Sequence, residues 1–149
     1  MPSPPSPDPA LTRATASDVD AIAALERAAL GPTGWPAAIV REEIEADRVV
    51  LVATAGDELC GWIDVGVVGD VADLHRVSVA ATARRRGVAT ALWLAARAEA
   101  ERRGADRVLL EVEEENAAAR ATYERWGFSV IARRRDYYGP GRDALVMQR

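Results

Sequence analysis

The sequence has few of the residues that most often carry covalent and metal chemistry. All nineteen basic residues are arginine, and there is one cysteine, Cys60, and one histidine, His75. The absence of lysine excludes catalysis through a lysine adduct. One cysteine cannot form an internal disulfide, and one cysteine with one histidine cannot supply the four ligands of a structural zinc site. We therefore expect no metal and a reducing, cytoplasmic compartment.

Long apolar runs are also missing. No stretch approaches the about 20 apolar residues that a membrane-spanning helix needs, so we expect a soluble protein with no membrane partner. The proline-rich start, MPSPPSPDPA, lacks the basic beginning and apolar centre of a signal peptide. It predicts a disordered tail over 1–10, followed by one domain over 11–149, because a chain of 149 residues is too short for two ordinary domains.

The first half of the chain is predicted to be mostly sheet. A short strand ends near Thr15, and a helix follows with Ser17 as its candidate N-cap. A second helix starts at Pro36, where a first-turn proline is tolerated. Three further segments are β-branched and apolar, and the first two predict an antiparallel hairpin; they cover 48–54, 59–68 and 71–81.

The second half alternates between helices and strands. Apolar residues recur at helical spacing over 87–103, and Gly104 is a good residue to end that helix. A strand over 106–113 follows, which predicts a right-handed crossover between parallel strands. Asn116 is the predicted N-cap of the next helix. The last three elements, one helix and two strands, cover 116–127, 129–138 and 143–149. The fold class is therefore α/β or α+β, built on one mixed sheet.

Three arginines, Arg84 to Arg86, stand directly before Gly87 at the start of the 87–103 helix. Helix N-termini expose unpaired amides and the positive end of the helix dipole, so they attract anions. Gly87 and the small Ala89 would let a phosphate approach the backbone. The stretch predicts a pyrophosphate site, with a solvated basic turn as the alternative. Nucleic acid is not expected as a partner, because the net charge is −4 and no aromatic residues interrupt the basic run.

The segment RRRGVA resembles the [Q/R]-x-x-G-x-[G/A] signature of the GNAT superfamily of N-acetyltransferases. Within that superfamily, the RimI-type ribosomal-protein-alanine N-acetyltransferases have the pattern E-V-R-x-x-N-x-x-A-x-x-x-Y-x-x-x-G-F, which the segment EVEEENAAARATYERWGF resembles. Their later motif resembles RRDYYGPGRDALVM, and their earlier motif resembles LERAALGPTGWP. The resemblance covers 11–149. It implies the GNAT fold, a mixed, mostly antiparallel sheet of about seven strands with helices on both faces and a splayed central parallel pair.

The resemblance also implies acetyl-CoA as cosubstrate and indicates where it would bind. The backbone of Val77, Ser78 and Val79 would hold the acetyl and pantetheine portion, because the family leaves these groups unpaired beside the splayed strands. Asn116 would contact the cofactor as well as cap its helix. The residues predicted to bind the pyrophosphate at the helix start are Arg84, Arg85, Arg86, Gly87, Val88, Ala89 and Thr90.

Two residues are assigned to the chemistry. Strand alternation places Glu111 and Glu113 on one face, and in a sheet covered on both sides the carboxylate at 111 would lie among apolar neighbours. By resemblance, Glu111 is the general base that receives the proton of the amine, and Tyr123 is the acid that protonates the departing CoA thiolate. The alternatives are a solvent-facing Glu111 and a Tyr123 that only packs against Ala119 and Trp126.

RimI-type enzymes acetylate the N-terminal alanine of a small-subunit ribosomal protein, which implies such a peptide as the substrate. Glu113 departs from their pattern by replacing an arginine, and Arg142 departs by replacing an acidic residue. The run Glu113 to Glu115 would form an acidic rim that favours a cationic peptide, with a solvated acidic turn as the alternative. Glu26 lies on an apolar helix stripe, where it would contact the substrate amine or the loop, with a solvated helix edge as the alternative.

The leading hypothesis is an acetyl-CoA-dependent Nα-acetyltransferase in which the amine attacks the thioester directly. An acetyltransferase for a small-molecule amine or a lysine side chain is the alternative within enzymes. A non-catalytic acyl-CoA-binding module is the alternative from another class, and the presence of both Glu111 and Tyr123 argues against it. Cys60 and His75 are expected to be structural residues.

Overall fold

The computed structural model describes residues 9–149, so most of the predicted tail over 1–10 lies outside the described residues, and Ala10 already begins the first strand. The strands are β1 (Ala10–Arg13), β2 (Val49–Ala55), β3 (Glu58–Val68), β4 (Val71–Val79), β5 (Arg107–Glu113), β6 (Ser129–Arg134) and β7 (Ala144–Gln148). The helices are α1 (Val19–Leu30), α2 (Ala37–Glu45), α3 (Val88–Arg102) and α4 (Ala117–Arg125). Within the described range, no helix has the length and apolarity that a bilayer crossing requires.

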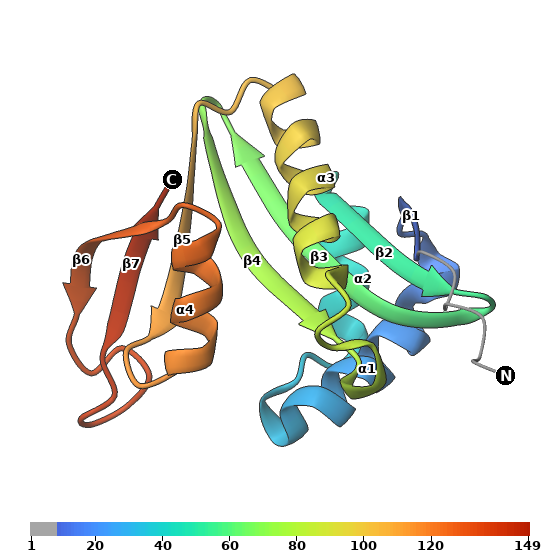
Figure 1. Ribbon diagram of the computed structural model, residues 1–149, viewed down its shortest axis with the longest axis horizontal. Helices are drawn as coiled ribbons and strands as arrows, with labels where there is room; N and C mark the ends of the chain where they lie inside the picture. Colours follow the sequence, from blue (N-terminus) through green and yellow to red (C-terminus); the bar gives the residue numbers. More distant parts are fainter. Residues whose placement is uncertain (1–8) are drawn as a thin grey trace, which may run out of the picture.

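The strands of residues 9–149 form one sheet of seven strands in the order β1-β2-β3-β4-β5-β7-β6. Every neighbouring pair is antiparallel except β4 and β5, which α3 connects as a parallel crossover (Figure 1). This arrangement confirms the predicted mixed, mostly antiparallel GNAT fold.

The central parallel pair separates along its length. β4 pairs with β5 only through Val71–Asp73 and Arg107–Leu109. Beyond these residues the two strands diverge, so that β1–β4 and β5–β7 form the two arms of a V (Figure 1). The predicted splay is confirmed, and the edge of β4 that faces β5 has no ladder partner beyond Asp73.

Two apolar clusters cover the two faces of the sheet. α3 packs on one face, where Trp93 stacks on Trp126 at a centroid distance of 5.5 Å and contacts Phe128 at 5.2 Å. α1 and α2 pack on the other face through a second cluster that includes Ile22 and Trp62, both fully buried. Because tight packing holds both arms of the V, the gap between them has a fixed shape.

The residues predicted to begin and end the helices are confirmed at two positions and wrong at one. Asn116 caps α4 as expected, since its side chain accepts a hydrogen bond from the backbone N–H of Ala119 at 3.2 Å. Gly104 has a φ of +101°, as its place after α3 requires. Ser17 as the cap of the first helix is wrong. Thr15 and Asp18 form a capping box one turn earlier, in which Asp18 Oδ2 accepts from the backbone N–H of Thr15 at 2.8 Å.

Candidate functional site

The first cavity of the site, the α3–α4 cavity, has a volume of about 390 Å³. Val77, Ser78 and Val79 of β4 line it on one side and Tyr123 of α4 on the other, as the cofactor assignment requires. A second hollow of about 320 Å³ continues it to the start of α3 and shares Val79, Arg84, Ala89 and Thr122 with it. The hollow is lined by Arg84, Arg85, Gly87, Val88, Ala89 and Thr90.

Gly87 gives the helix start its shape. It lies in the left-handed region with φ of +76°, where glycine is favoured, and a Cβ added there would meet no atom within 4 Å. The first turn of α3 therefore faces open space beside Arg84 and Arg85, which is the geometry of an anion site at a helix N-terminus.

Two of the predicted cofactor residues do not line these spaces. Arg86 and Asn116 border neither the α3–α4 cavity nor its continuation. Asn116 uses its side-chain oxygen as the helix cap described above. Thr90 does line the continuation, and its hydroxyl oxygen accepts a hydrogen bond from Trp126 Nε1 at 3.1 Å.

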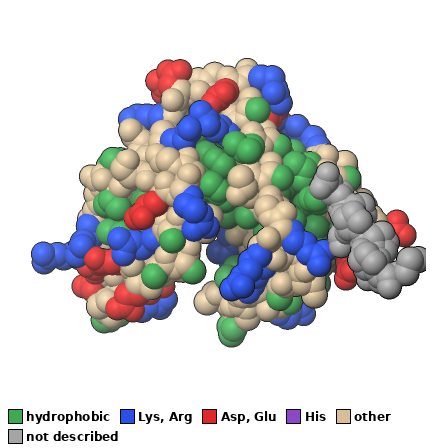
Figure 2. Space-filling model, viewed as in Figure 1, with side chains coloured by type: hydrophobic (Ala, Val, Ile, Leu, Met, Phe, Trp, Pro, Cys, Tyr) green, Lys and Arg blue, Asp and Glu red, His purple; other side chains and the backbone are tan. Residues whose placement is uncertain are grey.

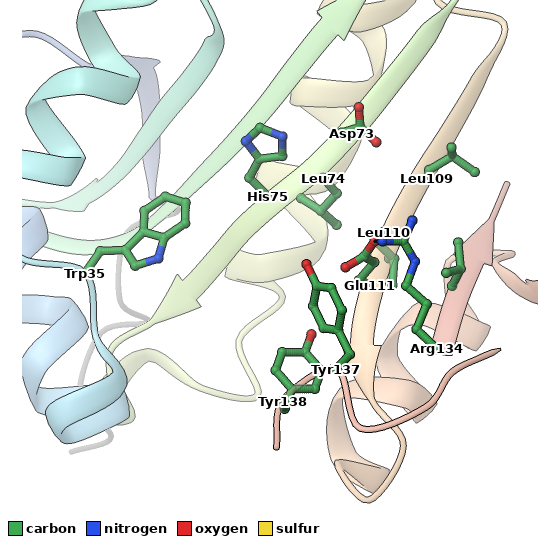
Figure 3. A pocket seen from close by; sticks show the side chains of 11 residues that line it. Trp35, Asp73, Leu74, His75, Leu109, Leu110, Glu111, Arg134, Tyr137 and Tyr138 are labelled. Carbon is green, nitrogen blue, oxygen red and sulfur yellow. Dashed lines mark ion pairs between the residues drawn. The ribbon is translucent and has the colours of Figure 1, made fainter. Parts of the chain in front are cut away.

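The second cavity, the β4–β5 cavity, has a volume of about 560 Å³ and lies where the two strands diverge (Figure 3). Asp73 and His75 come from β4, and Trp35 comes from the connection between α1 and α2. On the opposite side of the gap, Glu111, Arg134, Tyr137 and Tyr138 gather together. Figure 2 shows the surface hollowed between the two arms, with arginine side chains beside the opening.

Glu111 lies in this second cavity but is not surrounded by apolar side chains. Its side chain is 29% exposed, and its Oε1 lies 3.3 Å from Arg134 Nη1. A hydrogen bond to Glu111 raises the pKa of Tyr137, because the carboxylate stabilises the protonated phenol. The expected apolar environment is met only in part: leucine and valine side chains line the same cavity, but Arg134 and Tyr137 from the strand and loop after α4 reach the carboxylate.

Tyr123 is half-buried between Trp126 and Phe128, with ring centroids 5.7 and 6.1 Å away. Burial raises the pKa of its hydroxyl, and so does Tyr138, while Arg76 lowers it. Burial and the charge of Glu111 in turn raise the pKa of Tyr138. Tyr138, which lines the β4–β5 cavity, thus interacts electrostatically with Glu111 in the same cavity and with Tyr123, which lines the α3–α4 cavity.

Glu26 contacts the loop that carries Trp35, as one of the expectations for it stated, and the expectation of a solvated helix edge is wrong. Its side chain is completely buried. Its carboxylate accepts four hydrogen bonds, from Ser78 Oγ at 2.6 Å, Arg76 Nε at 2.7 Å, the Trp35 backbone N–H at 3.1 Å and Trp62 Nε1 at 3.2 Å. The network joins α1 to β3, to β4 and to the segment that presents Trp35.

That segment approaches α1 closely because of Gly34. A Cβ at this position would lie 2.5 Å from the backbone oxygen of Glu26, closer than real atoms allow. The guanidinium of Arg76 lies over the Trp35 ring at 4.9 Å, and its Nη2 donates to the Thr33 oxygen at 2.9 Å. Glycine therefore lets the indole reach the rim of the β4–β5 cavity.

A second buried polar cluster lies behind His75. Asp64 on β3 is completely buried, and neither carboxylate oxygen has a hydrogen-bond partner. Burial, then the charge of Glu43, raises the pKa of Asp64 to about 7. Arg48 is paired with Glu43, and its Nη1 lies 3.3 Å from His75 Nδ1. Burial and Arg48 lower the pKa of His75, so the imidazole is neutral near pH 7.

The predicted acidic rim is not a row of free charges. Arg142 donates to both carboxylate oxygens of Glu113, and Arg133 Nη2 donates to Glu114 at 2.6 Å. The prediction that this run is available to a cationic peptide is wrong for these two residues, because each meets an arginine from the far end of the chain. This leaves the charge of the rim largely neutralised.

Several residues of the β4–β5 cavity received no role from the sequence: Trp35, Asp73, Arg134, Tyr137 and Tyr138. The aromatic and arginine residues lie within GPTGWP and RRDYY, two segments that resemble RimI-type motifs. That resemblance could have indicated a role for them. Asp73 carried no signal, because a single aspartate on an alternating strand reads as a solvent-facing residue.

Two acetyltransferases are similar to this chain in sequence. The chain is similar to the [ribosomal protein bS18]-alanine N-acetyltransferase of Salmonella typhimurium, with 37% identity over 100 residues, or 65% of this chain and 68% of that protein. It is 32% identical to an N-alpha-acetyltransferase of Sulfurisphaera tokodaii over 151 residues, which covers 92% of this chain and 90% of the other.

Solved structures share the fold. The crystal structure of the ribosomal-protein-S18-alanine N-acetyltransferase from Escherichia coli matches with a TM-score of 0.85 and 27% identity, covering 94% of this chain and 92% of that one. An aminoglycoside 6'-N-acetyltransferase complexed with coenzyme A has a TM-score of 0.84 at 17% identity, covering 94% and 96%, and shows the common fold alone.

The family model of the Acetyltransferase (GNAT) family matches residues 19–128, a range that runs from α1 through the split strands to the end of α4 and its turn. Members of this family use acetyl-CoA as the acetyl donor. With the split sheet and the cavity at the start of α3, this match shows that the chain belongs to the GNAT family and is an N-acetyltransferase.

Proposed function

We propose that this enzyme acetylates the N-terminal α-amine of a protein, with the N-terminal alanine of a small-subunit ribosomal protein as the substrate. The observation that carries the proposal is the pair of cavities on either side of the split. The α3–α4 cavity would hold acetyl-CoA, and the β4–β5 cavity would admit the peptide. Both similar enzymes described above act, by their names, on such an amine.

The pyrophosphate of acetyl-CoA would lie at the start of α3, against Arg84, Arg85 and the open side of Gly87. The thioester would then extend along the unpaired edge of β4, where backbone groups of Val77 and Val79 need hydrogen-bond partners. In this arrangement the acetyl carbon would lie at the split, between the two cavities.

In the reaction, the amine nitrogen attacks the thioester carbonyl, a C–N bond forms and the C–S bond breaks. Tyr123 borders the α3–α4 cavity, and its raised pKa keeps the hydroxyl protonated near neutral pH. It can therefore donate a proton to the departing thiolate.

The incoming amine must lose its proton before it attacks. An α-amine has a pKa of about 7.7 to 8.0, so the cost of deprotonation at pH 7 is only about 1 kcal/mol. Glu111 is ion-paired with Arg134 and faces the β4–β5 cavity. Its carboxylate would accept a hydrogen bond from the ammonium group and receive its proton, directly or through water.

The proposal is tested by supplying acetyl-CoA with three kinds of acceptor: peptides that begin with alanine, lysine peptides with a blocked N-terminus, and small amines such as aminoglycosides. Mass spectrometry then locates the acetyl group. We expect the highest kcat/KM for the first set, with acetylation at the α-nitrogen. Higher kcat/KM for a lysine side chain or a small amine would overturn the peptide assignment and leave the family membership untouched.

A further inference from the structure

The charges around the β4–β5 cavity do not balance. Glu111 is paired with Arg134, and His75 is neutral with its Nδ1 beside Arg48. Asp73 also lines the cavity, yet its side chain forms no hydrogen bond or ion pair within residues 9–149. The cavity therefore holds one carboxylate without a counterion.

Its position is fixed by the sheet. Asp73 is the last β4 residue paired with β5, opposite Leu109, so it lies where the split begins. Figure 3 shows it at the narrow end of the gap, above Leu74 and on the side of Leu109. Glu111 lies two residues further along β5, and at a rise of about 3.3 Å per residue the two positions are separated by about 7 Å along the strands.

We propose that Asp73 is a specificity-determining residue that binds a positively charged side chain, guanidinium or ammonium, on the second residue of the acceptor peptide. The proposal rests on the proposed function, because it takes the α-amine to lie at Glu111. A side chain one residue further along an extended peptide can span about 7 Å. A half-buried carboxylate without a counterion favours a cation, because bringing a neutral or anionic group there desolvates its charge without compensation.

The surroundings support this choice of charge. Two carboxylates of the nearby turn, Glu113 and Glu114, are neutralised by Arg142 and Arg133 and so do not compete for the cation. The cation of the cavity, Arg134, is occupied by Glu111 and lies over the Tyr137 ring at 5.6 Å. Asp73 is thus the group in the cavity with charge left to offer.

The test compares three peptides that differ only at the second residue: Ala-Arg, Ala-citrulline, which keeps the shape of arginine without the charge, and Ala-Glu. Wild type is compared with Asp73→Asn, an uncharged variant of the same shape. Asp57→Asn, in the exposed turn between β2 and β3, is the matched control. We expect wild type to have a KM for Ala-Arg about tenfold or more below that for Ala-citrulline, the usual size of one charged hydrogen bond. Asp73→Asn should remove this difference with kcat unchanged.

Peptide binding to the CoA-bound enzyme, measured by calorimetry, separates this proposal from the proposed function. Tighter binding of Ala-Arg by wild type but not by Asp73→Asn supports the role of Asp73 even if the acetyl group is found elsewhere than on the α-nitrogen. Equal affinities of wild type for Ala-Arg and Ala-citrulline, or no binding of either, would overturn it. Asp73→Lys gives a converse check, since it should favour Ala-Glu over Ala-Arg.

Discussion

Arg142 and Glu113 form a bidentate ion pair, with Nε and Nη2 of the guanidinium donating to the two carboxylate oxygens at 2.6 and 3.0 Å. These are the two residues that depart from the RimI-type pattern. Because they contact each other, the departures amount to one exchange of charges between two positions. The pair ties the end of β5 to the loop that carries Tyr137 and Tyr138.

The exchange can be reversed. Glu113→Arg alone and Arg142→Glu alone each place like charges together, so both should lower kcat/KM by disturbing the tyrosine loop. The double variant should recover most of the loss, because it restores an ion pair of opposite orientation. Steady-state kinetics and melting temperatures check this. Losses that simply add in the double variant would show that the two side chains act independently.

The buried network around Glu26 should be costly to break. Glu26→Gln leaves the Arg76 guanidinium without its counterion, and removal of one partner of a buried pair costs about 3 to 5 kcal/mol. We expect a loss of about 3 kcal/mol in the free energy of unfolding, measured by guanidinium denaturation. Glu45→Gln at the exposed end of α2 is the control and should change little. A loss below about 1 kcal/mol for Glu26→Gln would mean that the carboxylate is replaceable.

Asp64 should make stability fall as the pH rises. Its pKa is about 7 in the folded protein against an ordinary 3.8, so between these values the folded state binds more protons than the unfolded chain. The free energy of unfolding therefore decreases from about pH 4 to about pH 7 and levels off above, where Asp64, Glu43 and Arg48 are all charged and His75 is neutral.

Asp64→Asn cannot ionise and should lack that decrease. We expect it to be more stable than wild type at pH 8, by about 4 kcal/mol, since the shift from 3.8 to about 7 is about three pKa units and each unit corresponds to about 1.4 kcal/mol. Below pH 4 the two proteins should be alike. Urea denaturation at several pH values provides the comparison, with Asp57→Asn as control. Parallel pH curves for wild type and Asp64→Asn would refute the assignment.

The start of α3 offers a matched pair of variants. Asn and Asp have nearly the same shape and both tolerate a positive φ better than other residues, so Gly87→Asn and Gly87→Asp differ mainly in charge. Only the aspartate should repel the pyrophosphate. We expect its Kd for acetyl-CoA to exceed that of the asparagine variant by about tenfold or more, which is about 1.4 kcal/mol. Equal Kd values for the two variants, measured by calorimetry, would contradict the assignment of the pyrophosphate to Gly87.

Glu111→Gln tests the proton acceptor. Loss of a general base lowers turnover by about 10²- to 10⁴-fold. The affinity for acetyl-CoA should not change, because Glu111 borders the other cavity. Activity should recover in part toward pH 9, where the α-amine loses its proton unaided. Wild-type turnover in the variant at pH 7 would remove Glu111 from the mechanism.

The sequence predicted what depends on near neighbours. Helical spacing and the glycine stop defined α3, and strand alternation correctly separated Glu111 and Glu113 from the buried Val108, Leu110 and Val112. Contacts between residues far apart in the chain could not be predicted. Trp62, Arg76 and Ser78 stand 36 to 52 residues from Glu26 in the chain, and no periodicity indicates that they converge on one carboxylate.

The site likewise has residues that the sequence predicted and residues that depend on tertiary packing. Resemblance located Tyr123, Glu111 and the start of α3, and the geometry places them around two adjoining cavities. It could not show that Arg134 would pair with Glu111, since the register of β6 and β7 is set by tertiary packing. It also could not show that the Asp73 side chain lacks a counterion, because that depends on which charged residues line the folded cavity.

The split between β4 and β5 also leaves a place in the sheet that a bound cosubstrate would fill. Three residue pairs join the strands, and beyond them the edge of β4 has backbone groups that a bound thioester chain would satisfy. A ligand that binds only the folded state adds RT ln(1 + [L]/Kd) to its stability, about 2.7 kcal/mol at a hundredfold excess over Kd. Acetyl-CoA bound at the proposed place would therefore raise the free energy of unfolding of the whole chain, and its contacts would lie where the two strands lack a ladder of their own.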